Sequence, residues 1–132
     1  MTMENNINEK VLYAAVLGRV IDALEISGQL VEDSAKLLVP VDTGNLRGSI
    51  THKVYRNDLI VRIGTPVEYA PYIEFGTGEH AENGQGRKGG WFYTDEKGNK
   101  HFTFGNKPQP FLRPALLNNK SKIDFIFKEI FK

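Results

Sequence analysis

The chain has 132 residues, enough for one domain with a modest hydrophobic core, and its 17 basic and 16 acidic side chains leave a net charge of only +1. The absence of cysteine excludes disulfides, thiolate nucleophiles and cysteine-based zinc sites. The polar start, residues 1–10, and the short apolar runs predict neither a signal peptide nor a membrane anchor, so we expect synthesis and assembly in the cytoplasm.

A long amphipathic helix is predicted for the first third of the chain. Apolar residues recur at three- and four-residue steps from Ile7 to Leu38, and no proline interrupts them before Pro40. A continuous helix of about 30 residues would be roughly 45 Å long, more than the width of so small a domain, so part of it is expected to pack on another subunit. Two shorter helices that meet at Ser27 and Gly28 are the alternative.

The next segment is predicted to lead through a short helical turn into a β-hairpin. Asp42 or Thr43 can cap the turn, which carries Leu46. Residues 50–56 and 59–64 are rich in β-forming side chains and are separated by Asn-Asp, so they predict two antiparallel strands, each with a core face and a mixed face.

Residues 68–78 are predicted to form a short helix, with Pro71 in its first turn and Gly76 just past its end. The following segment, residues 79–90, has four glycines and no large apolar residue, which predicts a mobile loop within the single domain 1–132. A second hairpin is predicted for residues 91–104, with Gly98 in its turn.

The chain is predicted to close with a helix that starts near Pro114, after an extended approach favoured by Pro108 and Pro110. The order of elements is therefore long helix, hairpin, short helix, hairpin and helix. Consecutive hairpins favour an α+β fold, in which an antiparallel sheet of two hairpins packs against the long N-terminal helix and the C-terminal helix.

Three segments then follow one another in a characteristic order: residues 41–50 (VDTGNLRGSI), 69–78 (YAPYIEFGTG) and 108–116 (PQPFLRPAL). In this order and spacing the chain resembles the small neck proteins of long-tailed phages and prophages, which are called head–tail joining, tail completion or minor tail proteins. A glycine-rich insertion that ends in an aromatic hairpin, residues 84–104, extends the resemblance to nearly the whole chain. The motif positions are Asp42, Thr43, Gly44, Leu46, Tyr69, Glu74, Gly76, Pro110, Phe111 and Pro114.

The resemblance implies a structural protein of the virion. Such proteins are α+β, are added late to the end of the tail tube or to the head portal, and form a ring there, often a hexamer, in contact with other neck and tail proteins. The resemblance implies no catalytic residue, no cofactor and no metal site, and none is assigned.

One patch has the composition of an interaction surface. Its members are Arg87, Lys88, Trp91, Phe92 and Tyr93. The aromatics can pack within their own hairpin, or stack on nucleic-acid bases beside the two cations. We favour a contact with another subunit, because an exposed aromatic hairpin next to a mobile loop suits docking onto a partner that orders it.

Other chemistries find little support. Asp42-Thr43-Gly44 is the triplet of aspartic proteases, but those enzymes need two carboxylates that share a proton, and helix capping explains Asp42 better. The three histidines lack the spacing of a helical metal pair. Glu74, in the short helix, is expected to form a buried ion pair with Arg113 or Arg47.

A nucleic-acid-binding module is the alternative function. The C-terminal segment contains four lysines, but it also holds Asp124 and Glu129, and the whole chain is nearly neutral. The lysines are Lys120, Lys122, Lys128 and Lys132. Any contact with DNA in a neck channel is therefore expected to be weak and without sequence preference.

Overall fold

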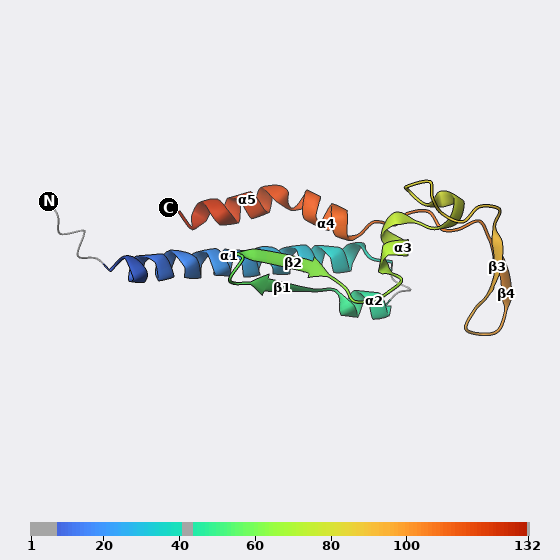
Figure 1. Cartoon of the computed structure of the whole chain (residues 1–132), viewed down its shortest axis with the longest axis horizontal. Coiled ribbons are helices and arrows are strands. Elements are labelled where there is room, and N and C mark those ends of the chain that lie inside the picture. Colours follow the sequence, from blue (N-terminus) through green and yellow to red (C-terminus); the bar gives the residue numbers. More distant parts are fainter. Residues whose placement is uncertain (1–7, 41–43, 132) are drawn as a thin grey trace.

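One helix, α1 (Glu9–Leu38), forms the axis of the protein in a computed structural model that describes residues 8–40 and 44–131 (Figure 1). It is continuous over 30 residues, which confirms the undivided helix expected from the sequence. The Asn8 side chain caps its start by accepting a hydrogen bond from the Lys10 backbone N–H at 2.9 Å. The buried residues of α1 begin at Ala23, so the first fourteen residues, 9–22, contribute nothing fully buried to the core.

The first hairpin packs along the second half of α1 (Figure 1). It consists of β1 (Thr51–Tyr55) and β2 (Ile60–Gly64), which pair in antiparallel register and follow a short helix, α2 (Gly44–Ser49). Alternate side chains of each strand are half-buried and the others are exposed, as predicted. The connection spans four residues, and its positive φ of 53° falls on Leu59 instead of on the Asn-Asp pair expected to make the turn.

The hairpin approaches α1 closely at Gly28. A Cβ atom there would lie 2.6 Å from Cδ2 of His52 and 2.7 Å from a methyl carbon of Val61. Gly28 therefore does not divide the helix. It supplies the space that lets the hairpin lie against the helix backbone.

The C-terminal part of the chain packs along α1 as two helices, α4 (Leu112–Asn118) and α5 (Lys120–Glu129), where a single helix was predicted (Figure 1). The break falls at Asn119, which is buried. Its side-chain amide donates to the backbone carbonyl of Ala115 at 2.6 Å and to the hydroxyl of Ser34 at 2.8 Å. A buried amide that binds the helix backbone in this way competes with helical hydrogen bonds. Pro114 lies in the first turn of α4, where no intrahelical N–H bond is required.

The core lies between the second half of α1 and the elements that follow it. Its buried members are Val31, Ala35, Val39, Leu46, Ile50, Ala70, Phe111 and Ala115. Leu46 and Phe111 are motif residues and are among the largest side chains that are fully buried. The motif segments therefore meet in the core, which gives these two positions a structural role.

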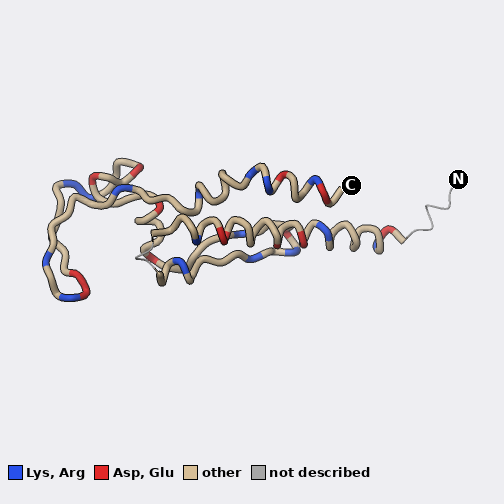
Figure 2. The backbone as a smooth tube through the Cα atoms, turned by 180° about the vertical axis from the view of Figure 1, so that it is seen from behind, with Lys and Arg blue, Asp and Glu red and all other residues tan. Residues whose placement is uncertain are grey.

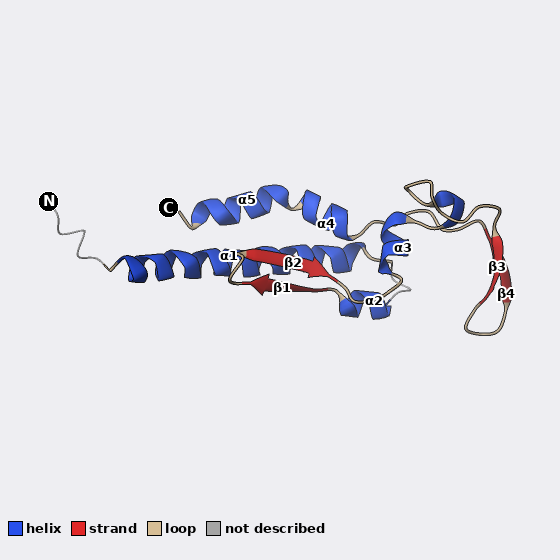
Figure 3. Cartoon of the chain, viewed as in Figure 1, coloured by secondary structure: helices blue, strands red, loops and turns tan. Residues whose placement is uncertain are grey.

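The second hairpin, β3 (Trp91–Thr94) and β4 (Lys100–Thr103), forms a two-stranded sheet of its own, although both hairpins were expected in one sheet (Figure 3). It follows a third short helix, α3 (Ala70–Phe75), and a 3-10 turn, η2 (Gly78–His80). The segments on either side carry it beyond the end of the helical body (Figure 1). The α+β class is confirmed, with the two hairpins at different places along the molecule.

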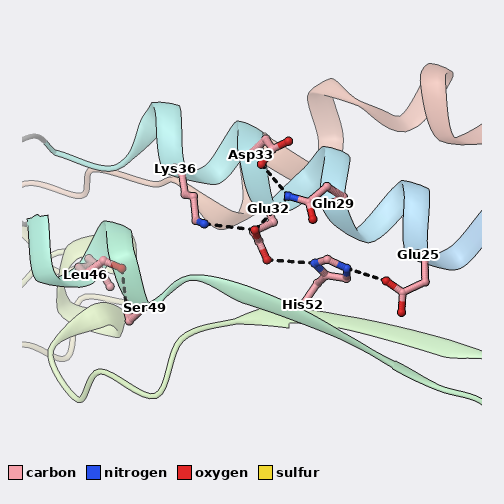
Figure 4. A network of polar contacts seen from close by, with 8 residues as sticks. All are labelled: Glu25, Gln29, Glu32, Asp33, Lys36, Leu46, Ser49 and His52. Atoms are coloured by element: carbon pink, nitrogen blue, oxygen red, sulfur yellow. Dashed lines mark hydrogen bonds and ion pairs between the residues drawn. The ribbon is translucent and has the colours of Figure 1, made fainter.

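A polar network holds the first hairpin to α1 (Figure 4). His52 Nδ1 lies 3.0 Å from Oε1 of Glu32, and His52 Nε2 lies 3.0 Å from Oε2 of Glu25. Glu32 is buried and also accepts hydrogen bonds from Lys36 and Gln29. A neutral imidazole has only one N–H, so two carboxylate partners require the doubly protonated imidazolium.

This network predicts a stability that depends on pH. Burial opposes protonation of His52, but its hydrogen bonds with Glu32 and Glu25 outweigh burial and raise its pKa above the ordinary 6.5. The stabilisation is therefore complete below about pH 6.5 and is lost as pH rises through the folded-state pKa. For Glu32, burial raises the pKa, but its bonds from His52 and Lys36 lower it overall, so that contribution is lost as pH falls below the ordinary 4.5 and through the folded-state pKa.

We expect urea unfolding to give greatest stability between about pH 4.5 and 6.5, with a decline on both sides. A His52→Gln variant should lose the decline on the alkaline side and keep part of the one on the acid side, because Lys36 and Gln29 still lower the pKa of Glu32. An identical alkaline decline in the variant would show that another group causes it.

Candidate interaction surfaces

The second hairpin and its flanking segments form a projecting arm, defined here as residues 77–106, at one end of the molecule (Figure 1). Its aromatic side chains are largely exposed, with Phe92 at 73% and three others near half. The three are Tyr93, Phe102 and Phe104. Phe92 packs edge-to-face on Phe102 at a centroid distance of 5.0 Å, and Phe102 packs in the same way on Phe104. These aromatics thus pack within their own hairpin, as one of the interpretations proposed, and they also stay exposed, so the favoured contact with another subunit stays a prediction.

The five residues predicted as one patch lie on different faces of the arm. Trp91 is half-buried, and the Arg87 guanidinium lies over its ring at 5.2 Å from the centroid. Phe92 follows in the strand and therefore points to the opposite face, where it pairs with Phe102. Tyr93 stacks on His101 across the hairpin, and Lys88 is exposed.

The glycine-rich segment is hydrogen-bonded to its surroundings at several points. The Glu79 N–H donates to the carbonyl of Phe104 at 2.8 Å, and the Glu82 N–H donates to the carbonyl of Phe75 at 2.9 Å. Gly78 and Gly86 pass so close to neighbouring backbone that a Cβ atom at either position would collide with it. These two glycines therefore permit close chain crossings, and mobility of residues 79–90 stays a prediction.

An apolar groove of about 840 Å³ lies at the root of the arm. One wall is α3, with Pro71, Tyr72 and Phe75, and the arm supplies Ala81, Arg87 and Trp91. Tyr72 is 61% exposed and Phe75 is 46% exposed. Because exposed aromatics beside a concave surface are typical of protein contacts, the groove is a candidate binding surface.

Glu74 fastens the root of the arm to the helical body. Its Oε1 accepts hydrogen bonds from the backbone N–H groups of Phe111 at 3.2 Å and Leu112 at 2.8 Å, and its Oε2 accepts one from Nε of Arg113 at 2.9 Å. The predicted buried carboxylate is confirmed, and of the two arginines considered, Arg113 is the partner. Arg113 also donates to Glu82 at 2.9 Å, so a single guanidinium links α3, α4 and the arm.

The electrostatics of Glu74 follow from this geometry. Burial raises the pKa of its carboxyl group, but the hydrogen bonds from Arg113 and from the Leu112 and Phe111 backbone outweigh burial and lower it. The carboxylate is therefore ionised at neutral pH and acts as a structural acceptor. The Arg113 guanidinium completes the site by lying over the Phe75 ring at 4.7 Å from its centroid.

A second exposed apolar surface lies at the opposite end of the molecule, where α1 extends from the body (Figure 1). We call residues 9–16 the α1 overhang. Every residue in it is exposed, including Val11 at 63%, Leu12 at 58%, Tyr13 at 67% and Val16 at 43%. Exposed apolar side chains on a helix are unfavourable in water unless a partner covers them. The overhang is therefore a second candidate binding surface.

The remaining predicted residues fall into three groups. Asp42, Thr43 and Lys132 lie outside the residues that the structure describes. Gly44 begins α2, and Tyr69 and Gly76 flank α3. Pro110 is exposed.

The three lysines of α5 share the helix with Asp124 and Glu129. Basic and acidic residues are likewise interspersed along the whole backbone (Figure 2). Within residues 8–40 and 44–131, no group of three or more His, Asp or Glu side chains is placed to hold a metal ion. No helix in the same ranges is long and apolar enough to cross a membrane.

Comparison with known proteins relates half of the chain to a family. A family model described as "Bacteriophage HK97-gp10, putative tail-component" matches residues 9–76. The matched region runs from the first residue of α1 to the glycine that ends α3, and the arm and the C-terminal helices lie outside it. No curated protein and no solved structure matches the chain.

Proposed function

Because the chain belongs to the HK97 gp10-like family of bacteriophage tail components, we propose that it is a structural protein of the phage neck that joins the head to the tail as part of a ring. The family membership supports a structural role in the tail or neck. The joining step and the ring are our proposal, and they draw on the sequence resemblance and on the surfaces of the chain.

The observation that carries the proposal is the balance between exposed and buried apolar side chains. In the part of the chain that the structure describes, twenty large hydrophobic side chains are exposed while ten hydrophobic residues are buried. Monomeric soluble proteins rarely expose large contiguous apolar surfaces, because each one costs free energy in water. An excess of exposed over buried apolar residues is typical of a protein that buries part of its apolar surface against other subunits.

The proposed mechanism is geometric. A ring forms when one surface of each subunit binds a different surface of the next and the rotation closes. The arm and the α1 overhang are two such different surfaces, and they lie at opposite ends of the elongated molecule (Figure 1). The expected number of six subunits comes from the sequence resemblance alone. The exposed aromatics of the arm remain available to a neighbouring neck or tail protein.

A weak contact with DNA passing through the ring is a secondary proposal. Lys53 and Arg62 lie directly opposite each other across the first hairpin, on the face turned away from α1, and both lie over the ring of Tyr55, at 5.2 and 5.1 Å from its centroid. Among the residues that the structure describes, no carboxylate forms an ion pair with Lys53 or Arg62. Two like charges in this position repel each other, and a phosphate backbone would relieve that repulsion.

Deletion of the gene from the phage tests the proposed function. We expect electron micrographs of the resulting lysate to show filled heads and assembled tails that are not joined, together with a loss of infectious particles. A plasmid copy of the gene should restore joined particles and serves as the control. Normal, joined and infectious particles without the protein would contradict the proposal.

A further inference from the structure

We propose that neighbouring copies associate head to tail, with the α1 overhang of one copy seated in the groove at the root of the next copy's arm. This inference rests on the proposed function, because it names the contact that would close the ring. The occupant of the groove is thus a second copy of this chain.

The overhang has the form of a helix that binds in a groove. Leu12 and Val16 are four residues apart and share one face of α1, and Tyr13 and Val16 are three apart. These side chains are between 43% and 67% exposed, so the rest of the chain leaves them largely uncovered. Apolar anchors at such spacings are the usual signature of a helix that lies in a partner's groove.

The groove offers matching chemistry. Its lining is mostly apolar, with Tyr72 and Phe75 on one wall and Trp91 on the other. Its charged lining residues are one of each sign, Glu82 and Arg87. The first turn of the overhang also carries one residue of each sign, Glu9 and Lys10, so docking brings no excess of like charge together.

The positions of the two surfaces favour a heterologous contact. The overhang lies near one end of the molecule, and α3 and the arm, which line the groove, lie near the other (Figure 1). One copy can therefore bind one neighbour through each surface. The family match begins at Glu9 and ends at Gly76, and it therefore contains both the overhang and the α3 wall of the groove. The arm, which forms the other wall, lies outside the matched residues. We therefore expect this wall to set the shape of the groove that is specific to this protein.

The apolar area that one such contact buries is too small to hold two isolated copies together stably. Four large apolar side chains bury on the order of 400 Å² when they are covered. A stable pair of proteins buries about 800 Å² on each partner. Two isolated copies should therefore associate weakly, while a closed ring gives each subunit two contacts. A test must consequently detect a weak and transient pair.

Site-specific cross-linking meets this requirement, because the chain has no native cysteine and introduced thiols react without background. Leu12→Cys places a thiol on the overhang and Tyr72→Cys places one on the groove, and both positions are more than half exposed, so neither variant disturbs the core. A mixture of these two full-length single variants should cross-link to dimers with a short bismaleimide. The double variant should form a ladder of higher oligomers.

The matched control pairs Leu12→Cys with Leu117→Cys, whose side chain is 69% exposed on α4 and outside the groove. We expect the overhang and groove mixture to cross-link at least about tenfold faster than this control, because docking raises the effective concentration of the two thiols. Equal rates would overturn the inference. So would dimers from Leu12→Cys alone at the rate of the mixture, since they would mean that overhang binds overhang.

The result separates this inference from the function on which it rests. If cross-linking fails while particles made without the protein still show unjoined heads and tails, the head-to-tail contact is overturned and the joining role stands. If cross-linking succeeds and those particles are normal, the joining role is overturned and the contact between copies stands.

Discussion

Replacement of Glu74 by alanine is expected to lower the free energy of unfolding by about 2–4 kcal/mol, because it leaves the N–H groups of Phe111 and Leu112 without their acceptor. Phe111 is fully buried, so water cannot replace the lost partner there. The Arg113 guanidinium loses its buried partner at the same time. Urea unfolding followed by circular dichroism measures the change.

Two matched variants separate the contributions at this site. Glu74→Gln keeps one oxygen acceptor for the backbone and removes the charge, so it should destabilise the protein less than alanine does. Glu82→Gln removes only the ion pair between Arg113 and the exposed carboxylate of Glu82. It should change the free energy of unfolding by less than about 1 kcal/mol. An alanine variant as stable as the Glu82→Gln variant would contradict the anchoring role of Glu74.

Replacement of Gly28 by alanine should lower stability by about 1–2 kcal/mol, although alanine favours helix formation by about 1 kcal/mol. The added methyl group meets the His52 ring and Val61 at less than 3 Å. His52 cannot turn aside freely, because carboxylates hold both of its ring nitrogens. The hairpin must therefore move away from α1, which disturbs the contact that joins the two elements.

Gly18 provides the control in the same helix. A Cβ atom there meets nothing within 4 Å, so Gly18→Ala gains helix propensity without a collision and should raise stability by up to about 1 kcal/mol. The two glycine variants should thus change the urea midpoint in opposite directions. A stabilised Gly28→Ala protein would mean that the hairpin does not rest on the helix backbone.

Local patterns were enough to predict most of the elements. The spacing of apolar residues in α1, the β-forming residues of both hairpins, and Pro71 and Gly76 around α3 act over a few residues, so the sequence alone indicates them. Features that depend on distant residues were not accessible in this way. Asn119, at the break in the last helix, is buried and donates a hydrogen bond to Ser34, which is 85 residues away in the chain.

The candidate surfaces were predicted in part. Exposed aromatics in the arm were expected, and strand alternation places Trp91 and Phe92 on opposite faces. Residue types did not reveal that this hairpin forms a sheet of its own. The choice of Arg113 over Arg47 as the partner of Glu74 required the packing of α3 against α4. Gly86 was assigned to a mobile loop by its glycine-rich surroundings, whereas the structure shows that it also permits a close approach to the backbone of Gly78.

The most direct test of the joining role is to add the purified protein to a lysate of the deletion phage, which supplies heads and tails made without it. We predict that joined, infectious particles form in proportion to the protein added, up to the number of unjoined heads. Heads and tails that stay separate at every concentration of the folded protein would contradict this account.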